Sequence, residues 1–293
     1  MTSFPLPRTL VESIAREDDP EREEWVERLP EIVTGLTERW SLTVGDPFQP
    51  GGQVSWVAPA RDADGRDLVL KVGWTHDEGR HEADGLREWA GRGAVTAFRT
   101  EVDGPTTAML LERCHPGTTL AESCAEPEQD EVVAGLLRQL WREPSPGHPF
   151  RPLTDMCDYW ADEFEKNYAD EPDAVDPGLA RAGMELFRGL PRADTPQKLL
   201  VTDLHAENVL AAQREPWLLI DPKPYVGDPA YDVLQHMLNC NDRLLADPRG
   251  LASRLADLAG LDAERVQLWL FARTVQESVT QPWLRPLPPQ LAP

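Results

Sequence analysis

The spacing of apolar residues changes along this chain of 293 residues, and that change constrains the fold more than any other feature. Between residues 42 and 112, short runs alternate apolar and polar positions and are broken by glycine, proline and aspartate, as in antiparallel strands and hairpins. Beyond residue 117 the apolar residues recur mostly at helical spacing. The sequence therefore predicts an α+β chain of two lobes, strand-rich and then mainly helical, with a hinge at 112–117 and domains 1–113 and 114–293.

The expected elements of both lobes are short. The first lobe is predicted to hold helices over 9–40, interrupted at Asp19-Pro20, and over 77–91, with strands at 42–48, 54–60, 67–74, 94–101 and 106–112. In the second lobe, helices are expected at 128–142, 153–169, 177–189, 229–246, 250–259 and 262–279. Two apolar runs there, at 198–210 and 217–221, predict short strands flanking a loop as one small hairpin. The proline-rich tail from Pro282 is expected to be loose.

Charge excludes some classes of partner. The chain carries 29 Lys+Arg against 51 Asp+Glu, a formal net charge of −22. Because nucleic acids and anionic membranes bind basic faces, we expect neither as a partner. The acidic surplus has two interpretations, a surface that keeps the protein soluble or a cleft that prefers cationic ligands.

The cysteines and the apolar runs predict a cytoplasmic location. Cys114, Cys124, Cys157 and Cys240 lie far apart and form no C-x-x-C pair, which argues against a disulfide framework or a zinc site. No apolar run reaches the roughly 18 residues that span a bilayer. The first sixteen residues also lack the pattern of a secretory signal. We expect a monomer or dimer with reduced thiols.

Lys71 is one of only four lysines and lies in the apolar run 68–72. A lysine there must find a partner for its charge. It is either an edge-strand lysine that reaches water or one that binds phosphate oxygens, with Glu82 in the following helix able to hold it. Gly51 and Gly52, between two expected strands, would let backbone N–H groups approach a phosphate.

The strongest motif combines Asp203 and Asn208, five residues apart on a predicted loop, with Asp221 at the end of the next strand. A phosphoryl-transfer site needs a carboxylate that accepts the substrate hydroxyl proton and oxygen ligands for Mg²⁺. Each residue alone would fit ordinary turn chemistry, since Asp and Asn favour loops. The combination favours phosphoryl transfer.

These residues resemble the aminoglycoside phosphotransferase family, and more narrowly its streptomycin 6-phosphotransferase and hydroxyurea kinase branch. The resemblance covers about residues 40 to 280. It rests on the segments Leu70-Lys71-Val72-Gly73-Trp74, His81-Glu82-Ala83-Asp84, Met109-Leu110-Leu111-Glu112-Arg113, Asp203-Leu204-His205, Glu207-Asn208-Val209-Leu210, Ile220-Asp221-Pro222 and Val226-Gly227-Asp228-Pro229. It implies a two-lobed protein-kinase-like fold, with a small antiparallel sheet in the N-terminal lobe and a larger, mostly helical C-terminal lobe.

The resemblance also implies a cofactor set of ATP and Mg²⁺ and a role for each site residue. Asp203 would be the catalytic base, and Asn208 and Asp221 would hold Mg²⁺. Lys71, held by Glu82 or less plausibly by Glu78, would contact the α- and β-phosphates. Gly51 and Gly52 would cover the phosphates, and Glu112 to Cys114 would receive adenine at the hinge. Asp228 and Asp232 would brace the catalytic loop.

One departure from the family pattern lies directly before the catalytic aspartate. The family usually has His-Gly there, whereas this chain has Val201-Thr202. Because that histidine is a scaffold in the family, we expect catalysis to survive, although a weakened or inactive member stays an alternative. His205 is interpreted as a support of the loop. Lys223 could reach a phosphate or be a surface lysine.

The acceptor is expected to be a small hydroxylated molecule, which would make the chain an ATP-dependent small-molecule phosphotransferase with an alcohol acceptor. The segment 155–176 is acidic, and Asp158, Asp162, Glu163 and Glu207 are candidates for binding cationic groups of a streptomycin-like antibiotic. They could equally form a solvated acidic face. The alternatives are a hydroxyurea or other antibiotic kinase and a catalytically silent nucleotide-binding module.

Overall fold

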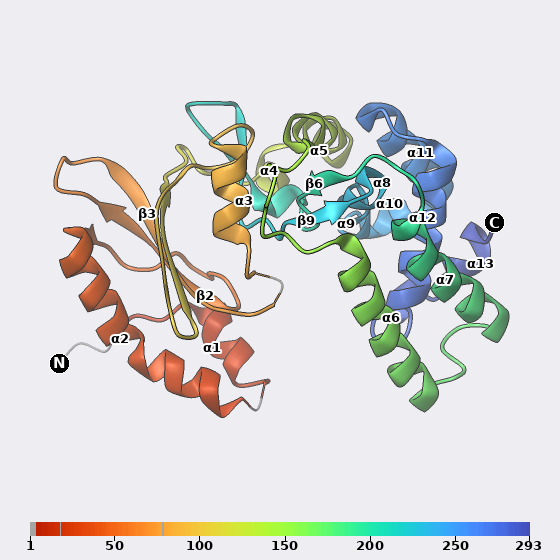
Figure 1. Ribbon diagram of the computed structural model, residues 1–293, viewed down its shortest axis with the longest axis horizontal. Coiled ribbons are helices and arrows are strands. Elements are labelled where there is room, and N and C mark those ends of the chain that lie inside the picture. The colour runs from red at the N-terminus through yellow and green to blue at the C-terminus, as the bar shows by residue number, and fades with distance from the viewer. Residues whose placement is uncertain (1–3, 18, 78) are drawn as a thin grey trace. The chain divides into compact units, whose positions relative to one another are not determined.

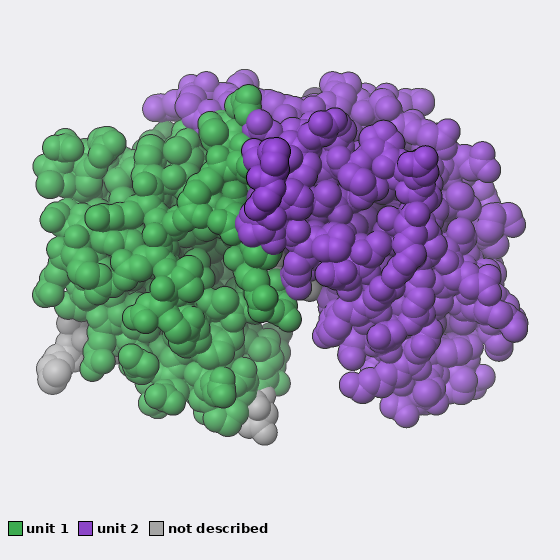
Figure 2. Space-filling model, in the orientation of Figure 1, with its two compact units in different colours: residues 1–117 green, residues 118–293 purple. Residues whose placement is uncertain are grey.

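The computed structural model describes residues 4–17, 19–77 and 79–293 of the chain (Figure 1). It divides into two compact units, residues 1–117 and residues 118–293, coloured green and purple in Figure 2. The division expected after residue 113 falls just before this boundary. None of the helices in the described residues is long and apolar enough to cross a membrane.

Unit 1 is built on one antiparallel sheet of five strands in the order β1-β2-β3-β5-β4. The expected break in its first helical stretch is present, because Asp19 caps a new helix that begins with Pro20. The elements are α1 (Arg8–Ile14), α2 (Pro20–Trp40), β1 (Thr43–Val44), β2 (Ser55–Arg61), β3 (Asp67–Trp74), α3 (Glu82–Trp89), β4 (Ala97–Asp103) and β5 (Thr106–Glu112).

The core of unit 1 lies between α2 and one face of this sheet. Successive side chains of a strand point to opposite faces, so Leu68, Leu70 and Val72 of β3 all face α2. From α2, Trp25 and Leu29 pack against them in the same cluster. The alternation places Lys71 on the opposite face of β3.

Unit 2 is mainly helical and contains two small antiparallel sheets, β6 with β9 and β7 with β8. Helices α7 and α12 pack against each other, as do α11 and α12 (Figure 1). The elements are α4 (Leu120–Ser123), α5 (Glu126–Leu140), α6 (Leu153–Asp170), α7 (Pro177–Gly189), η1 (Leu190–Arg192), β6 (Lys198–Leu200), η2 (Ala206–Asn208), β7 (Val209–Ala211), β8 (Trp217–Leu219), β9 (Tyr225–Gly227), α8 (Pro229–Asp232), α9 (Leu234–Leu238), α10 (Asn241–Ala246), α11 (Pro248–Ala259), α12 (Ala263–Glu277), η3 (Pro282–Leu284) and α13 (Pro288–Leu291).

Several expected elements were wrong in extent. The helix expected over 77–91 occupies only Glu82–Trp89, and the helix expected over 229–246 is three short helices. Residues 239–242 are Asn, Cys, Asn and Asp, and Asn and Asp side chains compete with helical backbone bonds. The single hairpin was also wrong in part, because β6 pairs with the unexpected strand β9 rather than with its neighbour in sequence.

The tail is not loose. Leu284, Leu287 and Leu291 are at most 2% exposed; Leu284 ends the short helix η3, Leu287 is the N-cap of α13, and Leu291 ends α13. Their spacing of three and four residues is helical, so one apolar face packs into unit 2 although prolines interrupt the segment.

Candidate active site

Lys71 and Glu82 form a buried ion pair in unit 1. Lys71 Nζ lies 2.7 and 2.8 Å from the two carboxylate oxygens of Glu82, and both side chains are nearly inaccessible. Glu82 is the first residue of α3, where a carboxylate also favours the positive end of the helix. The lysine therefore does not point to bulk water, as an edge-strand lysine would. Glu78, the other candidate partner, lies outside the described residues.

Gly51 and Gly52 lie in the loop before β2, against the N-terminal segment. Gly51 has a φ of +81°, and a Cβ there would come within 2.5 Å of the Cβ of Pro7. The same loop is held by the bond from Thr9 N–H to the Pro50 carbonyl. The chain therefore needs a glycine at 51 for packing alone, and contact with a phosphate stays a prediction.

Glu112 is the last residue of β5, and Cys114 follows two residues later. The Glu112 N–H donates to the Thr96 carbonyl, while the Glu112 side chain accepts from the Thr96 N–H, at 2.8 and 3.0 Å. The Cys114 side chain is buried. These bonds order the segment that is predicted to receive adenine.

Asp203, Asn208 and Asp221 lie on neighbouring segments of unit 2. The loop 201–208 joins β6 to β7, and its Asn208 Nδ2 donates to the Asp203 carbonyl at 3.0 Å. The Ile220 N–H donates to the Asn208 carbonyl at 2.9 Å, which extends the β7–β8 pairing and places Asp221 next to Asn208. The structure thus brings together the three residues that the motif singled out.

The donor set at this point fits Mg²⁺. The Asn208 amide nitrogen donates to the Asp203 carbonyl, so the amide oxygen is the atom of that side chain that could bind a metal. Asp221 adds a carboxylate, so the available ligands are the oxygens that Mg²⁺ prefers. Asp221 also has a φ of +53°, a left-handed conformation that is costly for a residue with a side chain and is often found at functional sites.

Asp232 braces the loop 201–208, which is predicted to be catalytic. Its carboxylate accepts from the N–H groups of Val201 and Thr202 at 2.9 and 2.6 Å, and from the Trp141 indole at 2.9 Å. Burial raises the pKa of Asp232 to about 6, and the three hydrogen bonds oppose that rise. Asp228 acts elsewhere: it caps α8 and accepts from Arg265 and Trp269 of α12.

His205 is mostly buried, and its Nε2 lies 4.0 Å from Asp203 Oδ1. Burial lowers the pKa of His205, although the nearby carboxylates of Asp203 and Glu207 act in the opposite direction. The imidazole is therefore neutral at pH 7. This state agrees with a supporting role.

Three of the four expected acceptor residues already have partners. Asp158 pairs with Arg192 and Asp162 with Arg188, which face α6 from α7 and η1. Glu163 lies 3.7 Å from Lys166. A cationic ligand would have to compete with these arginines. Glu207 is exposed and borders a cavity of about 390 Å³ that Gln129 and His236 also line.

Two residues contribute more than the motif indicated. Lys223 Nζ lies 2.9 Å from Asp203 Oδ2, so this lysine is held at the predicted base. The Thr202 hydroxyl donates to the Lys223 carbonyl. In the sequence, only the scarcity of lysine pointed to Lys223, and only the departure from His-Gly pointed to Thr202.

Comparison with known proteins identifies the family. Residues 39–283 match the family described as aminoglycoside/hydroxyurea antibiotic resistance kinase. The chain is 34% identical to a streptomycin 6-kinase of Streptomyces glaucescens over 284 residues, which is 94% of this chain and 90% of the relative. It is 35% identical to a hydroxyurea phosphotransferase of Kitasatospora aureofaciens over 280 residues, which is 92% of this chain and 78% of the relative.

A solved structure supports the fold. Amicoumacin kinase in complex with AMP-PNP, Ca²⁺ and its antibiotic is 12% identical, covers 92% of this chain and 96% of its own, and has a TM-score of 0.56. At that identity the likeness concerns the fold, which is protein-kinase-like as the resemblance implied. The sequence match over most of the chain carries the stronger conclusion. The chain belongs to the aminoglycoside/hydroxyurea antibiotic resistance kinase family.

Proposed function

We propose that this phosphotransferase moves the γ-phosphoryl group of ATP to a hydroxyl of a streptomycin-like aminoglycoside and thereby inactivates the antibiotic. The observation that carries the proposal is the adjacency of Asp203, Asn208 and Asp221 in a chain of this kinase family. A streptomycin 6-kinase among the similar relatives supports the acceptor class.

Transfer is direct and in line. The acceptor hydroxyl oxygen forms a bond to the γ-phosphorus while the bond from that phosphorus to the β–γ bridging oxygen breaks, and ADP leaves. Asp203 orients the hydroxyl and accepts its proton, so no phosphoenzyme forms. Because such a transition state is loose, positioning and charge stabilisation supply most of the catalysis.

The nucleotide is bound mainly by unit 1. Lys71, held by Glu82, contacts the α- and β-phosphates, and Gly51 and Gly52 cover them. Backbone groups from Glu112 to Cys114 receive the adenine. Asn208 and Asp221 would hold Mg²⁺, which when bound neutralises charge on the phosphates.

The acidic surplus favours a cationic acceptor. A net charge of −22 would attract guanidinium or ammonium groups, and an acceptor that reaches Asp158 or Asp162 would take the place of their arginine partners. Hydroxyurea carries no such groups and would gain nothing from this field. We therefore favour streptomycin-like molecules over hydroxyurea as the acceptor. We also propose that the enzyme is cytoplasmic.

The test is ADP release from Mg-ATP with streptomycin, hydroxyurea and other hydroxylated antibiotics offered separately. We expect turnover with streptomycin that Asp203→Asn abolishes while ATP binding is kept, because only the proton acceptor is lost. Asp242→Asn, an exposed carboxylate of α10, is the matched control and should keep full activity.

Two results would contradict the proposal. Turnover with hydroxyurea and with no other acceptor would show that the acceptor is hydroxyurea rather than an aminoglycoside. ATP binding without turnover on any acceptor, unchanged by Asp203→Asn, would favour a silent nucleotide-binding module.

A further inference from the structure

Lys223 contacts three successive residues at the start of the catalytic loop. Its N–H donates to the Val201 carbonyl at 3.0 Å, its carbonyl accepts from the Thr202 hydroxyl, and its ammonium lies 2.9 Å from Asp203 Oδ2. Lys223 is also two residues beyond Asp221. One residue thus joins the segment of the predicted metal ligand to the segment of the predicted base.

The contact with Thr202 compensates an unfavourable backbone conformation. Thr202 has a φ of +55°, in the left-handed region where a β-branched side chain is uncommon and costs free energy. Two interactions hold it there, the N–H bond to Asp232 at 2.6 Å and the hydroxyl bond to the Lys223 carbonyl. Both depend on atoms that the loop itself does not supply.

The ammonium contact fixes the side chain of Asp203. The Asp203 and Lys223 side chains are 15% and 28% exposed, so the pair is only partly screened by water. The carboxylate of Asp203 rotates about its own bonds unless something holds it. Asn208 Nδ2 lies 3.5 Å from the same Oδ2, at the limit of a hydrogen bond, so Lys223 is the nearer of these two groups.

We propose that Lys223 is a positioning residue of the phosphoryl transfer. Through its ammonium it holds the carboxylate of Asp203 in the orientation that accepts the acceptor hydroxyl proton. Through Thr202 it ties that loop to the segment of Asp221. The inference rests on the proposed function, because it assigns Lys223 to the step in which the hydroxyl oxygen bonds to the γ-phosphorus, ADP departs and the proton passes to Asp203.

The first test compares Lys223→Met with Lys223→Arg. A displacement of about 1 Å at a reacting group can cost roughly a hundredfold in rate, so we expect Lys223→Met to lower kcat by about ten- to a hundredfold. The KM for ATP should change by less than about threefold, and Lys223→Arg should recover part of kcat, because a guanidinium can still pair with the carboxylate. Lys198→Met is the matched control, since Lys198 in β6 is a similarly exposed lysine of the same unit, 3.7 Å from Glu143.

The second test separates the effect of the Thr202 hydroxyl group from the effect of its β-branched shape. Thr202→Val keeps the β-branch at positive φ and loses the hydroxyl bond, whereas Thr202→Ser keeps the hydroxyl. We expect Thr202→Val to lower both the melting temperature and kcat, and Thr202→Ser to lie close to the wild type.

A readout without turnover distinguishes failure of this inference from failure of the proposed function. Amide hydrogen exchange over 201–208 should speed up in Lys223→Met and stay unchanged in Lys198→Met, whatever the acceptor. Faster exchange in Lys223→Met together with a wild type that phosphorylates no acceptor would support the ordering of this loop by Lys223 and reject the proposed function. Unchanged exchange and unchanged kcat in Lys223→Met would overturn the inference, and so would a raised KM for ATP at constant kcat, which would make Lys223 a phosphate-binding group.

Discussion

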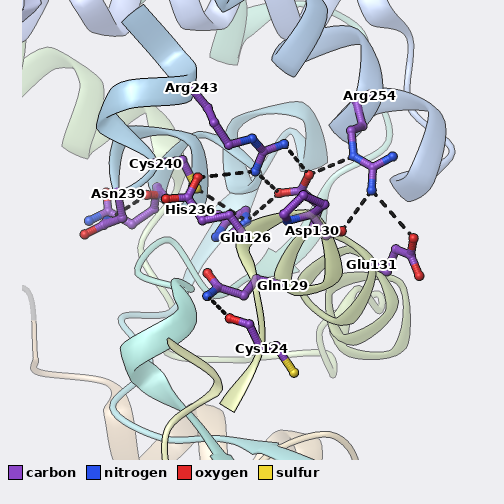
Figure 3. Close-up of polar contacts among 12 residues, drawn as sticks. Cys124, Glu126, Gln129, Asp130, Glu131, His236, Asn239, Cys240, Arg243 and Arg254 are labelled. Atoms are coloured by element: carbon purple, nitrogen blue, oxygen red, sulfur yellow. Dashed lines mark hydrogen bonds and ion pairs between the residues drawn. The ribbon is translucent and has the colours of Figure 1, made fainter. Parts of the chain in front are cut away.

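Two of the carboxylates that unit 2 buries, Asp130 and Asp232, are compensated in opposite ways. Asp130 in α5 and Asp232 in α8 are 0% and 1% exposed. Asp130 is surrounded by groups that are or can become cationic: Arg243 and Arg254 donate to it at 2.7 and 2.8 Å, and His236 Nε2 lies 3.0 Å away (Figure 3). Asp232 is surrounded by neutral donors, two backbone N–H groups and an indole.

The two environments shift the pKa values in opposite directions. Burial by itself raises the pKa of Asp130, but the hydrogen bonds from His236, Arg243 and Arg254 outweigh it and hold that pKa well below its usual range. For Asp232 burial dominates, and the pKa rises to about 6. Opposite charges therefore anchor α5 to α10 and α11, and the contact with His236 adds α9. Neutral donors connect Asp232 to the loop that carries Asp203.

The largest expected effect is on stability. Asp130→Asn should lower the free energy of unfolding by about 3–5 kcal/mol, because two arginines lose the buried charge that pairs with them. Denaturant unfolding measures this loss. The rate of phosphate transfer by the folded protein should stay near that of the wild type. A loss below about 1 kcal/mol would show that Asp130 is not the anchor of these helices.

The next effect is on catalysis. Asp232→Asn should lower kcat by about a hundredfold, or roughly 2.7 kcal/mol of barrier, because an amide group facing the N–H of Val201 and Thr202 displaces the loop. Steady-state kinetics with a saturating acceptor measures it, beside Asp242→Asn as the control. If Asp130→Asn reduced kcat as much, the division of tasks between the two carboxylates would fail.

The contributions of Asp130 and Asp232 to the free energy of unfolding should change with pH in opposite directions. The folded pKa of Asp130 is depressed, so its contribution is present above its unfolded pKa near 3.8 and is lost as the pH falls below that value. The folded pKa of Asp232 is raised, so its contribution is present below about 3.8 and is lost as the pH rises through about 6. Unfolding of each Asn variant and the wild type from pH 3 to 8 measures both, and parallel curves would contradict the assignment.

The smallest expected effect concerns metal. Asp130, His236 and Cys240 have ligand atoms within 4.8 Å of one another, an arrangement that could hold a cation. Two arginines already neutralise Asp130, and burial raises the pKa of the Cys240 thiol to about 12, so we expect the thiol to stay protonated. The melting temperature should not change when Zn²⁺ or a chelator is added. A rise with Zn²⁺ that His236→Gln removes would make this cluster a metal site.

Local patterns allowed much of the candidate site to be predicted. The position of Lys71 in an apolar run indicated a lysine that needs a charge partner, and Glu82 in the following helix was the predicted partner. The spacing of Asp203 and Asn208 matched a loop between short strands, and Asp221 followed the second strand. These relations span few residues, so backbone periodicity and turn chemistry are sufficient to indicate them.

Other parts could not be predicted, because they join segments that are far apart in the sequence. β6 pairs with β9 rather than with β7, and the three buried leucines of the tail lie among prolines that indicated a loose end. The pairing of Asp158 and Asp162 with arginines of α7 and η1 was likewise hidden in an acidic segment.

The sequence by itself determined the two-lobed α+β character, the need of Lys71 for a charge partner and the loop that carries Asp203 and Asn208, because each depends on the order and type of neighbouring residues. Only the tertiary structure decided which buried carboxylate meets cations and which meets neutral donors. Asp130 reaches Arg243 and Arg254 across more than one hundred residues, and Asp232 reaches Val201 across thirty-one. Chain folding alone brings such groups together, and the pKa of a buried carboxylate depends on the partners that folding supplies.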